Sequence, residues 1–308
     1  MAEGPVTWTS VFAGTEKAPE RRLSLKKPTR STDEAREFGG WTVDKLEVLR
    51  LYFAVYKRVA GNGTYIDAFA GTGQVKVGET IHQGSASIAL SSGAFKEFHF
   101  YERPSTARRL QRWIDESIDE KLRSRLTIVP GDVNETLVRD LDRGRVNKDK
   151  PCFAFLDPTS TQLNWSTIQE LAAYKAECDP PKTCKVELWI LFNTDHALMR
   201  LMPRTGQPPF ADVLNRWIGD EKGWRDLYEQ ERGPRAFVDR YADRLMQICG
   251  YGLARSLPIR DPQTGRRQYF MVHASDHPTA HDFMRWAARK AYPDSSEAIS
   301  LPGFGETS

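Results

Sequence analysis

Short apolar runs alternate with amphipathic segments over the first two thirds of the chain, and this pattern predicts a parallel β-sheet. The runs are rich in β-branched and aromatic residues, as expected of strands that are buried on both faces. They cover residues 64–69, 96–102, 126–129, 152–156 and 186–192. The segments between them, including 104–122 and 165–176, favour helices. Alternating strands and helices indicate a sheet with helices on both faces.

Two further runs in the last third depart from this alternation, because only a turn separates them. Residues 248–259 and 267–273 have the pattern of strands, and the sequence DPQTG between them is typical of a turn. A hairpin here adds one antiparallel strand to an otherwise parallel sheet. That plan is similar to the fold of class I S-adenosylmethionine-dependent methyltransferases, whereas a dinucleotide-binding sheet more often stays parallel. We therefore expect a Rossmann-like α/β fold of the methyltransferase type.

Other segments are expected to surround this sheet. Residues 32–60 have apolar residues three and four positions apart, which predicts a long helix capped by Thr32 or Asp33, with Lys45 among its polar positions. The segment 196–247 predicts a helical insertion. We expect a flexible basic arm over 1–31, one methyltransferase-like domain over 32–300 and a tail over 301–308.

Composition narrows the class of protein. Of the 308 residues, 40% are hydrophobic and 28% are charged, which is typical of a soluble globular protein. No apolar run approaches the ~20 residues of a membrane helix, and the first residues lack the pattern of a signal peptide. The four cysteines form no CxxC pair, so we expect reduced thiols in a cytoplasmic protein with no membrane contact. A net charge of +3 gives no general indication of nucleic-acid binding.

Polar residues follow the predicted strands where each strand ends. Asp67 and the turn through Gly71 and Gly73 come after the first strand. Glu102, Asp132, Asp157 and Asn193 follow the next four strands in order. Because the carboxyl ends of parallel strands share one edge, these residues predict a ligand site there. The alternative is a turn that only redirects the chain, with Asp67 capping it.

The residue types at this edge suit the adenosine part of S-adenosylmethionine. A carboxylate such as Glu102 can accept two hydrogen bonds from a ribose diol. Asp132 can accept a hydrogen bond from the adenine amine, and the backbone amide of Val133 or Asn134 can meet a ring nitrogen.

The first strand and its turn suit the amino-acid part of the same cofactor. Glycines allow close approach of the backbone, and Asp67 can hold the ammonium group directly or through water. Ser85 is expected to cap a helix whose N-terminus suits a carboxylate. The expected cofactor-binding residues are Asp67, Phe69, Gly71, Gly73, Ser85, Glu102, Asp132, Val133 and Asn134.

Other nucleotide sites match the turn less well. The turn reads G-x-G-x-x-K, without the third glycine of the dinucleotide fingerprint, and no acid lies near the usual ~20 residues further on. The chain also has no GxxxxGK[ST] phosphate loop. A nucleotide-dependent oxidoreductase is thus the weakest of the alternatives.

The block that begins at Asp157 carries the expected methyl-transfer chemistry. Methyltransferases that act on an exocyclic amine often use an Asn or Asp, two prolines and an aromatic residue at this position. The acid and a backbone carbonyl hold the amine, and the ring stacks on the base. The sequence here is Asp157-Pro158-Thr159-Ser160, so only the first half is kept, and Trp165 is the candidate stacking residue. The alternative is that Asp157 caps the turn and Trp165 belongs to the core.

Two other groups of residues are candidate binding sites. His273, His277 and His281 are four residues apart, but Pro278 is expected to begin a helix after His273, so we predict no metal site. The basic residues between 96 and 125 favour a solvated surface, with phosphate contacts as the alternative if they adjoin the site.

Several segments resemble the three-Cys-motif partner protein (TcmP) family. They are WTVDKLEVLRLYFAVY, YIDAFAGTG, QGSASIAL, FHFYE, GDVN, CFAFLDPTSTQLNW, VELWILFN and YFMVHASDHPTAHDFM, which extend from about Trp41 to Met284. The DAFAGTG turn and the LDPTSTQLNW block are the most specific. The resemblance implies a methyltransferase-like domain and a partner that resembles radical-SAM enzymes and carries the three cysteines.

We therefore expect an S-adenosylmethionine-dependent methyltransferase that acts on a nucleic acid or a nucleotide-type acceptor. Asp157 and Pro158 are the expected catalytic residues, and Trp165, Asn193 and Lys45 are expected to contact the acceptor. The alternative is a methyltransferase-like module without catalytic activity, which binds a radical-SAM-like partner or nucleic acid.

Overall fold

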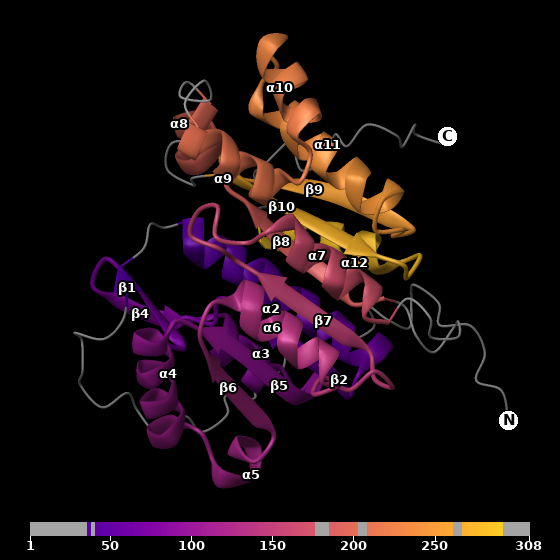
Figure 1. Cartoon of the computed structure of the whole chain (residues 1–308). Helices are drawn as coiled ribbons and strands as arrows, with labels where there is room; N and C mark the ends of the chain where they lie inside the picture. The colour runs from indigo at the N-terminus through magenta and orange to yellow at the C-terminus, as the bar shows by residue number, and fades with distance from the viewer. Residues whose placement is uncertain (1–35, 38–40, 176–184, 203–207, 261–266, 292–308) are drawn as a thin grey trace, which may run out of the picture.

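The computed structural model describes residues 36–37, 41–175, 185–202, 208–260 and 267–291. In this part of the chain a seven-stranded sheet lies between two layers of helices (Figure 1). In spatial order its strands are β6 (Leu126–Pro130), β5 (Phe95–Glu102), β2 (Gly63–Asp67), β7 (Cys152–Leu156), β8 (Glu187–Phe192), β10 (Arg267–Ser275) and β9 (Leu253–Arg260). The strands are parallel except β10, which is antiparallel to both β8 and β9. The predicted fold class is confirmed, including the hairpin at the end of the sheet.

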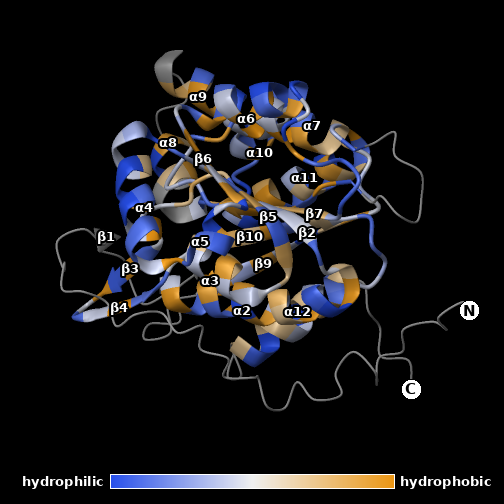
Figure 2. Cartoon of the chain, turned by 90° about the horizontal axis from the view of Figure 1, so that it is seen from below, coloured by the Kyte–Doolittle hydropathy of each residue, from blue (hydrophilic) through white to orange (hydrophobic). Residues whose placement is uncertain are grey.

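Each central strand sends alternate side chains to two separate cores. In β7, Cys152, Ala154 and Leu156 face one helical layer, while Phe153 and Phe155 face the other. The first layer contains α6 (Val133–Asp142), α7 (Trp165–Ala173) and α11 (Pro234–Gln247). The second contains α2 (Trp41–Ala60), α3 (Ser85–Ser92) and α12 (Ala280–Ala291). Figure 2 shows the two layers on opposite sides of the strands.

The segment after β8 is helical, as predicted. It contains a π-helix η1 (Thr194–Leu198), α8 (Met199–Leu201), α9 (Pro208–Ile218), α10 (Glu221–Glu229) and α11. Trp217 of α9 stacks on Phe192 at the end of β8, with ring centroids 4.6 Å apart. These helices therefore join the first core. No helix among the described residues is long and apolar enough to cross a membrane.

Two element predictions are wrong. No strand is predicted between the glycine turn and Ser85, but residues 74–83 form a hairpin of β3 (Gln74–Val77) and β4 (Thr80–Gln83), which β1 (Arg36–Glu37) joins as a third strand. The predicted helix over 32–60 begins only at Trp41, because residues 36–37 belong to this small sheet. Its proposed caps Thr32 and Asp33 lie outside the described residues.

The predicted basic helix over 104–122 is divided in two. It forms α4 (Pro104–Ser117) and α5 (Glu120–Arg123), because the Asp119 side chain accepts a hydrogen bond from Leu122 N and caps a new turn. The basic arm, the C-terminal tail, the turn at 261–265, Cys178 and Cys184 lie outside the described residues.

Candidate functional site

The register of the sheet brings the predicted carboxylates to one edge. Asp67 pairs with Phe100 of β5 and Phe155 of β7, so Glu102 and Asp157 each lie two residues beyond a partner of Asp67. Glu102 in turn pairs with Pro130, and Asp132 lies two residues further. Neighbouring strands are about 4.8 Å apart. The four acids therefore follow four adjacent strand ends, as predicted from the sequence.

Asp67 itself is closed to direct contact with a ligand, which corrects its predicted role. It is fully buried, and its carboxylate accepts hydrogen bonds from Tyr65 Oη at 3.0 Å, from Phe69 N at 3.2 Å and from Ser85. Burial raises the pKa of Asp67 to about 7, an effect that the three hydrogen bonds oppose and nearby Asp157 increases. Asp67 thus holds the strand end, the turn and α3 together.

The glycine turn is held against α4 and α3. Gly71 has φ +63°, and an added Cβ would meet no described atom within 4 Å, so the backbone there is open to a ligand. Gly73 has φ +82°, and a Cβ there would lie 2.3 Å from the ring of Trp113. The packing of Trp113 on Gly73 was not predicted, since the two residues are distant in sequence.

Two neighbours of the turn have other roles than those predicted. Gly84, rather than Ser85, is the N-cap of α3, and no side chain caps this helix. Gly84 N donates to Gly73 O at 2.9 Å, which fixes the helix start beside the turn and leaves the Ser85 hydroxyl to bind Asp67. Phe69 is partly buried against the first core.

At the ends of β5 and β6 the predicted acids reach the surface. Glu102 is half-buried, and its Oε2 accepts a hydrogen bond from Arg103 N at 2.7 Å. Asp132 is exposed and caps α6 through Asn134 N, 2.8 Å from its Oδ1. The Val133 side chain is buried in the core, so only its backbone remains near the edge.

Asn134 is a structural bridge, which corrects its predicted contact with adenine. Its Nδ2 donates to Asp132 Oδ1 at 2.9 Å and to Gln162 O at 2.8 Å. Its Oδ1 accepts from Asn164 N and Thr167 Oγ1 at 2.9 and 2.8 Å. The backbone amide is also engaged by Asp132. Asn134 therefore ties the start of α6 to the segment that follows Asp157.

Asp157 forms an ion pair with Lys45, a residue 112 positions away that the sequence placed on a polar helix face. The side chains are 20% and 7% exposed, and Lys45 Nζ lies 6.0 Å from the Phe155 ring centroid and 5.8 Å from that of Tyr269. Lys45 Nζ contacts Oδ2 of the Asp157 carboxylate. Lys45 lies on α2, in the second layer of helices, and thus fixes the orientation of the Asp157 carboxylate.

The residues after Asp157 are held by Asn193, which directly follows strand β8. Pro158 is buried, and the carbonyl of the next residue, Thr159, accepts a hydrogen bond from Asn193 Nδ2 at 3.1 Å. Asn193 is itself 7% exposed. It therefore positions the Asp157 block, and its predicted contact with an acceptor has no support from this geometry.

Trp165 does not offer a stacking face, which corrects a further prediction. It is 4% exposed, and its ring packs against Tyr241 at a centroid distance of 5.1 Å. The Arg244 guanidinium lies 4.7 Å from the ring centroid, and a Cβ on Gly219 would lie 2.2 Å from the ring. Trp165 belongs to the core, as the alternative interpretation held.

His273 is on a strand, as predicted, but the following helix begins at Ala280 rather than at Pro278. His273 lies on β10 and His281 on α12, and their rings stack with centroids 6.0 Å apart. Among the described residues, no group of three or more His, Cys, Asp or Glu is placed to hold a metal ion.

Proteins similar to this chain are found among solved structures, and not among protein families or curated proteins. No protein-family model and no curated protein matches the chain. Among solved structures, protein LPL1258 from Legionella pneumophila has a TM-score of 0.49 and 10% identity over 82% of this chain and 91% of its own. The glycopeptide N-methyltransferase MtfA complexed with sinefungin has a TM-score of 0.41 and 15% identity, over 88% of this chain and 98% of its own. TYW2 from M. jannaschii in complex with AdoMet has a TM-score of 0.37 and 12% identity, covering 77% and 76%.

Proposed function

We propose that this protein is an S-adenosylmethionine-dependent methyltransferase whose acceptor is a nucleic acid or a nucleotide-type molecule. The observation that carries the proposal is the row of carboxylates at four adjacent strand ends, in a sheet with the strand order of class I methyltransferases.

The residues present fit this cofactor at three points. Glu102 is half-buried and Asp132 is exposed, and their carboxylates are proposed to bind the ribose and the adenine amine. The backbone at Gly71 is open on the side where any other residue would place a Cβ. The buried Asp67, Tyr65 and Ser85 keep that turn in position without touching the ligand.

When bound, the cofactor supplies a methyl group on a positively charged sulfonium. Asp157 is proposed to accept a hydrogen bond from the acceptor amine through Oδ1, because Lys45 engages Oδ2. The Pro158 carbonyl is proposed to hold the second amine hydrogen. Lys45 and Asn193 act as positioning residues, since they contact the Asp157 block.

The experiment is calorimetry with S-adenosylmethionine and S-adenosylhomocysteine, followed by radiolabelled methyl transfer into cellular RNA, DNA and protein fractions. Asp157→Ala should lower transfer by about 100-fold while cofactor affinity changes little, since Asp157 is proposed to touch only the acceptor. Asp149→Ala, at an exposed acid outside this edge, is the matched control. Absence of cofactor binding would contradict the proposal.

We also propose membership in the TcmP family, on the sequence resemblance alone. It implies a partner that resembles radical-SAM enzymes. Co-expression with such a partner, followed by size-exclusion chromatography, tests this proposal, and separate elution of the two proteins would contradict it.

A second candidate function is a methyltransferase-like module that binds this partner or nucleic acid without catalysis. The observations that favour it are the missing second proline after Asp157 and the burial of Trp165, which leaves no described aromatic face from that block for an acceptor base. Cofactor binding without transfer to any fraction, with or without the partner, would support this second function.

A further inference from the structure

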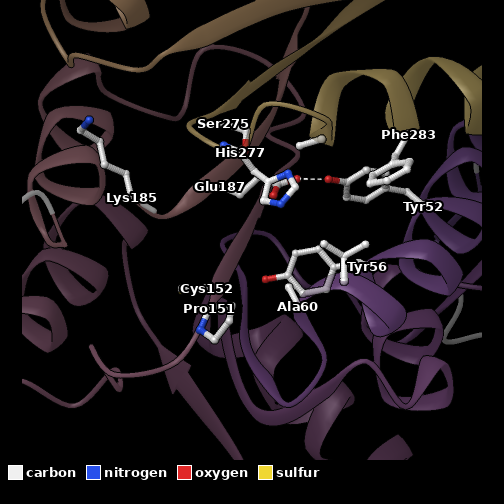
Figure 3. Close-up of a pocket in the computed structure, with 12 residues that line it drawn as sticks. Tyr52, Tyr56, Ala60, Pro151, Cys152, Lys185, Glu187, Ser275, His277 and Phe283 are labelled. Carbon is white, nitrogen blue, oxygen red and sulfur yellow. Dashed lines mark hydrogen bonds between the residues drawn. The ribbon is translucent and has the colours of Figure 1, made fainter. Parts of the chain in front are cut away.

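A separate cavity lies at the other end of the strands, where the parallel strands begin. Its volume is about 200 Å³, and it lies between helices α2 and α12 and the first residues of β7 and β8 (Figure 3). Its walls include Tyr52, Tyr56, Cys152, Glu187 and Phe283. The carboxylates of the proposed methyl-transfer site follow the other ends of the same strands, so this cavity is not part of that site.

Glu187 gives the cavity a buried negative charge. Its side chain is 10% exposed, and Tyr52 Oη and His273 Nε2 both contact Oε1, the latter at 2.9 Å. Figure 3 shows Glu187 beside Tyr52, with their hydrogen bond drawn. Among the described residues both contacts end on Oε1, so Oε2 is the oxygen that a ligand in the cavity can reach.

The other polar groups of the lining do not cancel this charge. Lys185 Nζ donates to Gly250 O at 2.7 Å and to Asp276 Oδ2 at 3.3 Å, so its own charge is paired outside the cavity. His277 Nδ1 accepts a hydrogen bond from Thr279 N at 3.4 Å, within its own turn. Glu187 is the one carboxylate among the described lining residues.

Aromatic rings provide the second feature of a cation site. Tyr52 and Tyr56 lie one helical turn apart, with ring centroids 6.2 Å apart and planes tilted by 50°, and Phe283 of α12 stands beside them in Figure 3. Ring faces attract organic cations, and a carboxylate beside them adds charge complementarity. The volume is below the ~300–1,000 Å³ of sites for larger ligands, which excludes a nucleotide.

We propose that this cavity binds a small alkylammonium ion, with the nitrogen at Glu187 Oε2 and its carbon groups against the Tyr52 and Tyr56 rings. The inference goes beyond the proposed methyl transfer and does not depend on it. Binding is expected in the absence of S-adenosylmethionine.

The test is saturation-transfer NMR with four probes of similar size: n-butylammonium, butyltrimethylammonium, neutral 1-butanol and anionic butanoate. The two cations should bind at least tenfold more tightly than the neutral and anionic probes. Equal binding of all four, or no binding of either cation, would overturn the proposal.

Two variants locate the site. Glu187→Gln should weaken cation binding at least tenfold, whereas the control Glu97→Gln should not, although Glu97 also receives a histidine contact, from His99 Nε2 at 2.8 Å. Because Glu187→Gln could disturb folding, Ala60→Phe provides an independent variant. Ala60 is a half-buried lining residue at the end of α2, and a ring there would fill the cavity. Unchanged binding in a folded Ala60→Phe variant would place the cation elsewhere and contradict the proposal.

Discussion

Asp67 shows that an ionisable residue at the proposed ligand-binding edge can serve the scaffold instead of the ligand. Its position after an apolar strand was sufficient to predict the edge of the sheet, but not the direction of its side chain. Three donors around it, Tyr65 Oη, Phe69 N and Ser85, enclose the carboxylate completely. A buried carboxylate with three donors is satisfied as a hydrogen-bonded group, while its negative charge remains costly.

The cost of burying the negative charge of Asp67 predicts that the stability of the protein depends on pH. The folded pKa of Asp67 is raised from 3.8 to about 7, so the folded state holds this proton more tightly than the unfolded state. The stabilisation that comes from this bound proton is present at low pH and is lost as the pH rises through about 7. Relative to Asp67→Asn, which stays neutral, the wild-type free energy of unfolding should fall by about 2 kcal/mol between about pH 5 and pH 7. Urea denaturation over this range measures the difference, with Asp149→Asn as an exposed control. Parallel pH profiles of wild type and Asp67→Asn would contradict the raised pKa.

The Lys45–Asp157 pair should be worth more than ordinary surface pairs, because both side chains are largely buried. Lys45→Met would leave Asp157 charged and unpaired, and should lower the free energy of unfolding by about 2–3 kcal/mol. Adding Asp157→Asn should restore about 1–2 kcal/mol of this loss, because the stranded charge is removed. Arg50→Met breaks the exposed Arg50–Glu47 pair of the same helix and should cost at most about 1 kcal/mol. Additive effects of the two substitutions in a double-mutant cycle would show that the pair is not coupled.

At the scale of elements, the turn after β2 depends on α4 as well as on its own glycines. Gly71→Ala meets only the strain of a positive φ, about 1–2 kcal/mol, because the space beside it is open. Gly73→Ala adds a clash with Trp113, so its total cost should be about 3 kcal/mol or more. Thermal denaturation of the two variants makes a matched comparison. Trp113→Ala should remove the excess cost of Gly73→Ala, and an excess that persists would rule out the clash as its cause.

The element predictions succeeded where burial alone decides the pattern. All strands of the seven-stranded sheet could be predicted, and the limits of β7 were predicted to the residue, because β2, β7 and β8 are buried at each position and give continuous apolar runs. The β3–β4 hairpin was missed because its residues are half-buried or exposed and its sequence is mostly polar, although Val75 and Val77 alternate as in a strand. The roles of residues whose neighbours are distant in the sequence could not be predicted either. Trp165 is enclosed by Tyr241 and Arg244, and Lys45 is turned inward by Asp157.

At the scale of the whole molecule, the sheet has a protected centre and more open edges. Every residue of β7 and β8 is buried, and each strand has a neighbour on both sides and a core on both faces. Strand β6 has one neighbour, and only Val129 of its five residues is buried. Opening β7 or β8 therefore requires loss of both cores, whereas β6 can separate with little exposure of apolar surface.

Native-state hydrogen exchange should reveal this difference. Amides of β7 and β8 should exchange only through global unfolding, so their protection should fall steeply with added denaturant, in step with the overall stability. Amides of β6 should exchange sooner, with a weak dependence on denaturant, because local opening exposes little surface. Both proposed sites adjoin this protected pair, since Asp157 follows the end of β7 and Glu187 begins β8 at the opposite end of the strands. Exchange of β8 amides as fast as those of β6, with equal denaturant dependence, would show that the two cores do not stabilise the sheet from its centre.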